Sequence, residues 1–169
     1  MLPDMAEITL GGNPIHTNGD LPSEGSASPD FTLTKADWEP VTGADLAGQR
    51  VVLNIFPSID TPTCQTSVRT FNERAAGLDN TTVLCVSADL PPAAARFCGA
   101  EGIDNVATGS TFKNPEVLDA FGVRMTDGKL EGIAARAVVV LDTDGTVLHS
   151  QLVPEVANEP DYDAALAVL

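Results

Sequence analysis

A proline, a threonine and a cysteine form the pattern Pro57-x-x-x-Thr61-x-x-Cys64, between the apolar run 51–56 and an amphipathic segment. Pro62 follows Thr61, and because proline is favoured at the first position of a helix, Thr61 is the predicted N-cap. Cys64 is then close to free backbone N–H groups and to the positive end of the helix dipole, which favour thiolate over thiol. A thiolate at neutral pH is a nucleophile, so the sequence predicts a reactive cysteine.

The helix expected to begin here should place Cys64 against the protein interior. Val68, Phe71 and Ala75 lie at helical spacing and should face the core. Cys64 lies one turn before Val68, so its sulfur is expected near the wall of a pocket. The Thr61 hydroxyl could cap the helix or hydrogen-bond the sulfur, and the sequence does not choose between these roles. A small buried cysteine that packs as a hydrophobe is the alternative interpretation.

Arg136 is a second candidate for chemistry. It stands at the start of the segment 137–141, a predicted strand that should be buried on both faces. An unpaired guanidinium there would be costly, so we expect an anionic partner. A thiolate at the end of a neighbouring strand is one such partner, and the arginine would favour its ionised form. An ion pair with a carboxylate, or a solvated strand end, is the alternative.

The other cysteines and the two histidines are less informative. Cys98 ends a predicted helix of about eight residues, short enough to open locally. Such opening could bring its sulfur to a partner, since a disulfide needs Cα atoms within ~7 Å; an ordinary helix residue is the alternative. Cys85 lies in the middle of an apolar strand and is expected to be inert. His16 and His149 are assigned to the surface or to ordinary hydrogen bonding, without acid–base partners.

The composition excludes several classes of protein. The formal net charge is −15, from 24 acidic and nine basic residues, which disfavours binding to nucleic acids and anionic lipids. No apolar run approaches the ~20 residues of a membrane span. Residues 1–7 lack the features of a signal peptide, so a cytoplasmic location is predicted. With three cysteines and no C-x-x-C, we expect neither a permanent structural disulfide nor a zinc site or other cofactor.

Hydrophobic runs and turn residues indicate the order of the elements. Strands are predicted at 51–56, 83–87 and 106–108, and helices followed by glycine stops at 64–76, 91–98 and 115–121. Two hairpins are predicted, one over residues 7–17 and one formed by 137–141 and 146–151. A strand starting at Phe31, a short helical turn at 44–48 and a last helix at 161–169 complete the set.

This alternation favours an α/β fold with a mixed central sheet and helices on both faces. Such a three-layer arrangement is thioredoxin-like, with the hairpin at 7–17 as an addition. A chain of 169 residues fits one globular domain, and no repeat or shift in composition divides it. We therefore predict a single domain over residues 1–169.

Several segments together resemble the bacterial thiol peroxidases, a subfamily of the peroxiredoxins. Pro57-x-x-x-Thr61-x-x-Cys64 is similar to the peroxiredoxin active-site signature. The longer matches are VVLNIFPSIDT (51–61), VLCVSADLP (83–91), RFCGAEG (96–102) and AARAVVVLD (134–142), followed by SQLV (150–153) and EPDYDAAL (159–166). The resemblance covers nearly the whole chain, and several long blocks are more specific than one short motif.

The resemblance implies a role for each candidate residue. Cys64 would be the peroxidatic cysteine, which attacks the peroxide O–O bond and becomes a sulfenic acid. Cys98 would be the resolving cysteine of the same subunit, closing a disulfide that thioredoxin reduces. Pro57 would shield the sulfur, while Thr61 and Arg136 would orient the peroxide and favour the thiolate. The resemblance also implies a homodimer, hydrogen peroxide and organic hydroperoxides as substrates, and no metal or haem.

Three other functions stay open at this point. A non-catalytic redox sensor would use the same disulfide, but it would oxidise slowly and bind a partner in one redox form only. A general disulfide oxidoreductase is disfavoured by the absence of C-x-x-C. A purely structural thioredoxin-like module leaves both Arg136 and the cysteine at the helix start unexplained.

Overall fold

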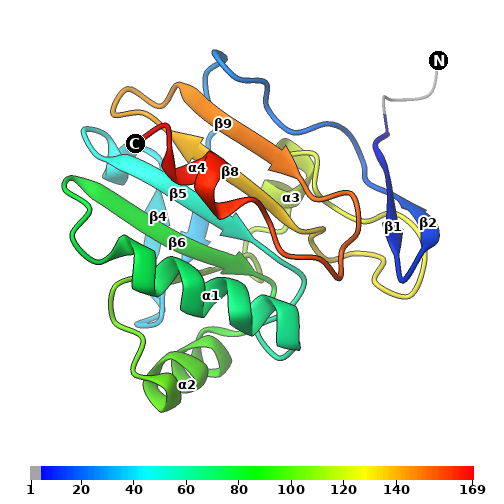
Figure 1. Cartoon of the computed structure of the whole chain (residues 1–169), viewed down its shortest axis with the longest axis horizontal. Coiled ribbons are helices and arrows are strands. Elements are labelled where there is room, and N and C mark those ends of the chain that lie inside the picture. The colour runs from blue at the N-terminus through cyan, green and yellow to red at the C-terminus, as the bar shows by residue number, and fades with distance from the viewer. Residues whose placement is uncertain (1–4) are drawn as a thin grey trace.

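Seven strands form one sheet in the order β4-β3-β7-β6-β5-β8-β9 (Figure 1). The structure is a computed structural model that describes residues 5–169, so the start of the segment tested for a signal peptide lies outside the described residues. The strands are β3 (Thr32–Thr34), β4 (Pro40–Thr42), β5 (Arg50–Ile55), β6 (Thr81–Ser87), β7 (Ala107–Ser110), β8 (Ala137–Leu141) and β9 (Val147–Leu152).

The central strands are parallel and apolar. β6 runs parallel to both β5 and β7, whereas β8 runs antiparallel to β5. In this register Leu53 of β5 faces Leu84 of β6 and Val139 of β8. The runs of valine, leucine and isoleucine in β5, β6 and β8 are typical of strands that are buried on both faces. Because the carboxyl ends of parallel strands meet at one edge, the segments that follow β5, β6 and β7 lie together.

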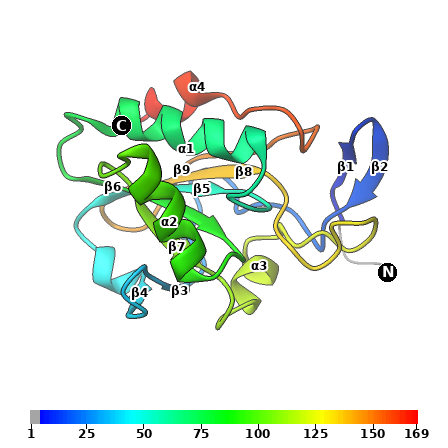
Figure 2. The same ribbon diagram turned by 90° about the horizontal axis from the view of Figure 1, so that it is seen from below.

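Helices cover both faces of this sheet, which confirms the predicted fold class (Figure 2). Val52 of β5 packs with Phe71 on one face, and Leu53 packs with Phe121 on the other, as alternation along a strand requires. Within residues 5–169, no helix has both the length and the apolar character needed to cross a membrane. The face of the sheet that holds Val52 is covered by α1 (Pro62–Ala75), α2 (Pro91–Glu101) and α4 (Tyr162–Leu166). The face that holds Leu53 is covered by α3 (Glu116–Ala120).

The predicted elements are present with shifted ends, and one strand was missed. α1 begins at Pro62 with Thr61 as its N-cap, as predicted. The helical turn predicted at 44–48 is a 3₁₀ helix, η1 (Ala44–Leu46). β4 was not predicted, because a three-residue edge strand that begins with proline carries almost no periodic signal.

The prediction that α2 ends at Cys98, with Gly99 as its stop, is wrong. The helix continues to Glu101, and the residue that ends it is Gly102 in the left-handed conformation, with φ of 65°. Glycine adopts this conformation without the steric cost that a Cβ atom imposes. Gly99 stays helical, since a glycine inside a helix costs only ~1 kcal/mol. Cys98 is therefore an interior helix residue and not a terminal one.

The N-terminal hairpin lies beside the main sheet (Figure 1). It consists of β1 (Glu7–Leu10) and β2 (Asn13–His16), joined by a turn at two glycines, as predicted. Its buried side chains pack into a separate cluster that includes Met125 and Val156. The segment that holds Val156 also borders the site described next, because its carbonyl accepts a hydrogen bond from Arg136.

Candidate active site

Cys64 is the third residue of α1 and has no exposed surface. Its side chain packs in a cluster with Phe56, Ile59 and Val68. The side chain is kept away from solvent, as expected, and its burial is complete. The pocket wall expected beside the sulfur stays a prediction. The sulfur therefore sits among apolar groups at the positive end of a helix, where few groups can balance a negative charge.

Arg136 supplies such a group. It directly precedes β8 and is only 2% exposed. The pairing of β5 with β8 brings it to the same edge as the loop after β5. Its Nη2 donates a hydrogen bond to Cys64 Sγ at 3.3 Å, and its Nε donates to the Val156 carbonyl at 2.8 Å. Nη1 is also buried and has no partner within residues 5–169, so donors remain free beside the sulfur.

Thr61 takes neither of the two roles that the sequence left open. Its hydroxyl makes no capping bond to the helix, and it donates to the Ser58 carbonyl at 3.1 Å. Pro57, which is buried, begins the loop in which Ser58 lies. Because the hydroxyl proton is used in this way, the lone pairs of the Thr61 oxygen are left to accept a hydrogen bond.

A glutamate that the sequence did not single out holds the segment behind Arg136. The Glu155 carboxylate accepts hydrogen bonds from the backbone N–H groups of Gly12 and Ala157, each at 2.8 Å, and from the Thr9 hydroxyl at 3.1 Å. The backbone donors at Ala157 and Gly12 lower the pKa of Glu155 to about 2. Glu155 thereby ties the hairpin to the segment whose Val156 carbonyl accepts from Arg136.

A buried polar chain lies beneath α1. Asn54 is the next-to-last residue of the apolar strand β5, and its side-chain Nδ2 donates to Ser67 Oγ at 3.2 Å. Ser67 donates in turn to the Cys64 carbonyl at 2.8 Å. Buried polar groups need such partners. An asparagine within an otherwise apolar strand was the available signal for this chain, and sequence reasoning missed it.

All three cysteines are free thiols. Cys98 is partly buried and packs against the cluster that contains Cys64. It also lines a cleft of about 390 Å³ together with Lys35, Val106 and Thr108. Burial raises the pKa of the Cys98 thiol, so in this arrangement the sulfur is kept protonated. Burial also raises the pKa of Cys85 to about 12, as expected of an inert core thiol.

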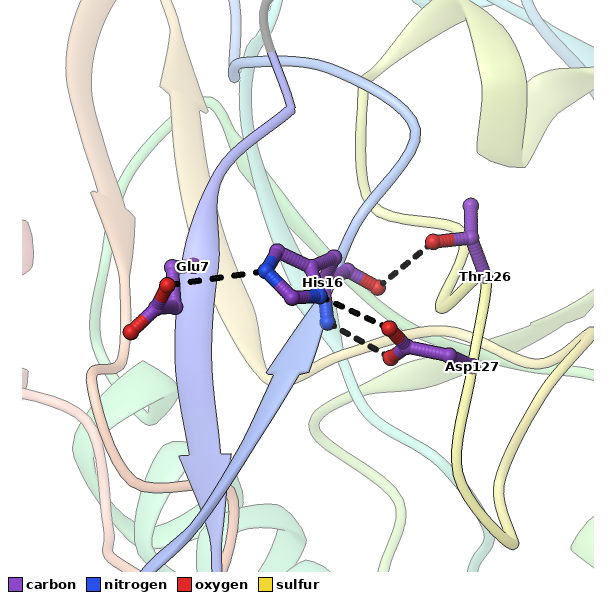
Figure 3. A network of polar contacts seen from close by, with 4 residues as sticks. All are labelled: Glu7, His16, Thr126 and Asp127. Carbon is purple, nitrogen blue, oxygen red and sulfur yellow. Dashed lines mark hydrogen bonds and ion pairs between the residues drawn. The ribbon is translucent and has the colours of Figure 1, made fainter.

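The expectation that neither histidine has acid–base partners is wrong for His16 (Figure 3), and His149 Nδ1 also lies 4.0 Å from Glu24 Oε1. His16 Nδ1 lies 2.7 Å from Asp127 Oδ2, and its Nε2 lies 3.5 Å from Glu7 Oε2. The hydrogen bond with Asp127 is the main reason why the pKa of His16 is raised. This network joins the hairpin to the loop after α3 and lies apart from Cys64. Within residues 5–169, His, Cys, Asp and Glu side chains do not gather in threes that could hold a metal ion.

Comparison with known proteins places this arrangement in a family. The Redoxin family model matches residues 23–166. Thiol peroxidases of Mycobacterium tuberculosis and Mycobacterium bovis are 54% identical over 165 residues, which cover 98% of this chain and 99% of theirs. A peroxiredoxin-like protein from Aquifex aeolicus has a similar solved structure, with a TM-score of 0.91, 36% identity and coverage of 98% of this chain and 97% of that chain.

A thiol peroxidase from Chromobacterium violaceum shares the fold with a TM-score of 0.85 at 20% identity, over 96% of this chain and 94% of its own. The matches extend over almost the full length of the chain and include the segments that hold Cys64 and Arg136. The chain therefore belongs to the redoxin family, among the thiol peroxidases.

Proposed function

We propose that the protein is a thiol-dependent peroxidase in which Cys64 reduces hydroperoxides. The single observation that carries the proposal is the contact between Arg136 Nη2 and Cys64 Sγ at 3.3 Å, at the start of α1. A buried guanidinium against a buried sulfur at a helix start favours the thiolate, because a positive charge in contact compensates the cost of burying a negative one. The unpaired Nη1 supplies a further donor for an oxygen atom.

In the first step the Cys64 thiolate attacks one oxygen of the peroxide. An S–O bond forms, the O–O bond breaks, and the departing alkoxide or hydroxide takes up a proton to leave as alcohol or water. The sulfur is oxidised to sulfenic acid while the peroxide is reduced. Arg136 stabilises the charge that moves onto the leaving oxygen, and the Thr61 oxygen accepts the peroxide O–H and so orients it. Pro57 covers the sulfur from solvent.

In the second step Cys98 attacks the Cys64 sulfenic acid. An S–S bond forms, the S–O bond breaks, and the oxygen leaves as water after taking up a proton. Partial burial keeps Cys98 protonated in the fully folded arrangement, so α2 has to open before this thiol can ionise and reach Cys64. A dithiol protein of the thioredoxin type then reduces the disulfide and returns both thiols.

The complete burial of Cys64 favours a peroxidase over a general disulfide oxidoreductase. A protein disulfide cannot reach a sulfur without exposed surface, whereas a hydroperoxide is small enough to enter with slight movement of the surrounding loops. We further propose that the whole chain acts as one cytoplasmic domain, assembled as a homodimer, that binds neither nucleic acid nor membranes. The strongly acidic composition supports the last point.

Three cysteine variants test the proposal. Cys64→Ser should abolish the consumption of hydroperoxide, because the nucleophile is lost. Cys98→Ser should still react once per subunit, but it should not be recycled by thioredoxin. Cys85→Ala is the matched control and should turn over normally, since its thiol is buried and protonated.

Stopped-flow kinetics and mass spectrometry after one equivalent of peroxide measure these outcomes. The wild-type protein should contain a disulfide that joins Cys64 to Cys98. Normal peroxide consumption by Cys64→Ser would disprove the assignment. Oxidation of wild type on a scale of minutes, in place of rapid turnover, would favour the redox sensor.

A further inference from the structure

Asp89 connects the ends of three parallel strands. Its carboxylate accepts hydrogen bonds from the Ser58 hydroxyl at 2.8 Å, the Ile59 backbone N–H at 2.7 Å and the Ser87 hydroxyl at 2.6 Å. Its own carbonyl accepts from the Ser110 hydroxyl at 2.6 Å. The three serines follow or end β5, β6 and β7 in turn. One aspartate therefore receives a hydroxyl from each strand end at the edge where the site lies.

The bonds to Ser58 and Ile59 fix the loop that leads to Cys64. Ser58 Oγ also accepts the backbone N–H of Asp60 at 3.2 Å, and the Ser58 carbonyl accepts the Thr61 hydroxyl at 3.1 Å. The orientation of the Thr61 hydroxyl thus depends on the position of Ser58. The Asp89 carboxylate holds that position by accepting the hydrogen bonds from Ser58 and Ile59. Hydrogen bonds to a charged acceptor are stronger than hydrogen bonds between neutral groups.

The backbone of Asp89 is itself anchored to the sheet. Its N–H lies within hydrogen-bond distance of Ser87 Oγ, and its carbonyl is held by Ser110 of β7. Asp89 directly precedes Leu90, the N-cap of α2. Ser87 and Ser110, which anchor Asp89, belong to β6 and β7 and not to α2. The Ser58–Thr61 loop therefore stays fixed even when α2 opens to release Cys98.

From these contacts we infer that Asp89 is a positioning residue of the peroxidase reaction: it fixes the Ser58–Thr61 loop so that the Thr61 oxygen faces the incoming peroxide. The inference rests on the proposed function. It predicts a selective defect, because Thr61 orients a peroxide, whereas a simple alkylating agent such as iodoacetamide needs only the thiolate. A merely structural role for Asp89 would change both reactions together or neither.

The experiment compares two reactions of Cys64 in the reduced full-length protein. Asp89→Ala should lower the rate constant for oxidation by hydrogen peroxide by ~10²-fold, the effect expected from misplacing a catalytic group by about 1 Å. The rate of alkylation by iodoacetamide should not fall more than about threefold, because Arg136 and the helix start are unchanged. Asp89→Asn should be intermediate, since the amide oxygen can still accept from Ile59 and Ser87.

Asp104→Ala is the matched control. Asp104 is exposed and takes no part in the contacts of Asp89, so both rates should equal those of wild type. If Asp89→Ala does not fold, Ser58→Ala removes only the loop side of the contact and should lower the peroxide rate selectively by ~10-fold. Equal losses in both reactions, or no loss in the peroxide reaction, would overturn the inference. A wild-type protein that does not react with peroxide would instead refute the proposed function.

Discussion

Arg136→Lys separates the positive charge at the site from the geometry of the guanidinium. The native side chain reaches two atoms at once, the Val156 carbonyl from Nε and Cys64 Sγ from Nη2. A lysine ammonium keeps the charge but cannot make both contacts from one position. The loss of one charge-assisted hydrogen bond is worth ~1.5–3 kcal/mol. Since each 1.36 kcal/mol is tenfold in rate, oxidation of Cys64 should slow by about 10- to 150-fold.

Arg136→Met removes the charge as well and should be slower still. At 3.3 Å the attraction between guanidinium and thiolate is on the order of 5 kcal/mol at an effective dielectric constant near 20. Much of this is lost with the charge, so we expect a rate at least ~10-fold below that of the lysine variant. Both rates are measured by stopped-flow oxidation of the reduced protein, with circular dichroism to verify that the variants are folded.

Arg74→Lys is the control for both variants. Arg74 is a partly exposed residue in the last turn of α1 that pairs with Asp163, so its replacement should leave the oxidation rate within about twofold of wild type. An Arg136→Lys variant as fast as wild type would refute the argument from paired hydrogen bonds. An Arg136→Met variant as fast as wild type would show that the arginine does not act on the sulfur.

Two further predictions concern the dependence of stability on pH. Asp127 and Glu7 raise the pKa of His16 above 6.5, so the contribution of this network is complete below that value and is lost as the pH rises through the raised pKa. The difference in unfolding free energy between wild type and His16→Gln should therefore shrink as the pH rises above 6.5 and through the raised pKa, and a constant difference in urea titrations would contradict it. The pKa of Glu155 is lowered from 4.5 to about 2, so its contribution is complete above 4.5 and is lost as the pH falls toward 2. In thermal unfolding measured at a series of pH values, Glu155→Gln should be less stable than wild type near neutral pH and equally stable near pH 2. A loss of stability that persists in acid would refute this.

The start of α1 could be predicted because it depends on a strong and local rule, whereas for Arg136 the sequence predicted only that a partner is needed and left its identity open. Pro62 fixes the first turn of the helix, and with it the place of Cys64. A buried guanidinium requires an anionic or polarisable partner, and the thiolate that follows the neighbouring strand β5 was one of the partners that the sequence left open. The burial of the Cys85 thiol was likewise predictable, since an apolar run on both sides of a cysteine indicates a buried strand.

The end of α2 was not predictable from the same kind of rule. Gly99 and Gly102 are both acceptable helix stops by residue type, and only the conformation of the chain after Glu101 distinguishes them. The network of His16 was missed for a different reason. Its partner Asp127 lies 111 residues away, in a loop whose path depends on how the hairpin docks. No spacing in the sequence records a contact of that kind.

The contacts of Asp89 combine both situations. The sequence places a serine at the end of β6 and of β7 and another three residues after β5, and parallel strands bring those ends to one edge. That much follows from topology alone. Which of these residues accepts and which donates depends on side-chain chemistry: serine hydroxyls can do both, whereas an ionised carboxylate can only accept. An aspartate among serines at such an edge is therefore the residue toward which the donors turn, and this rule could be applied before the structure of such a site is known.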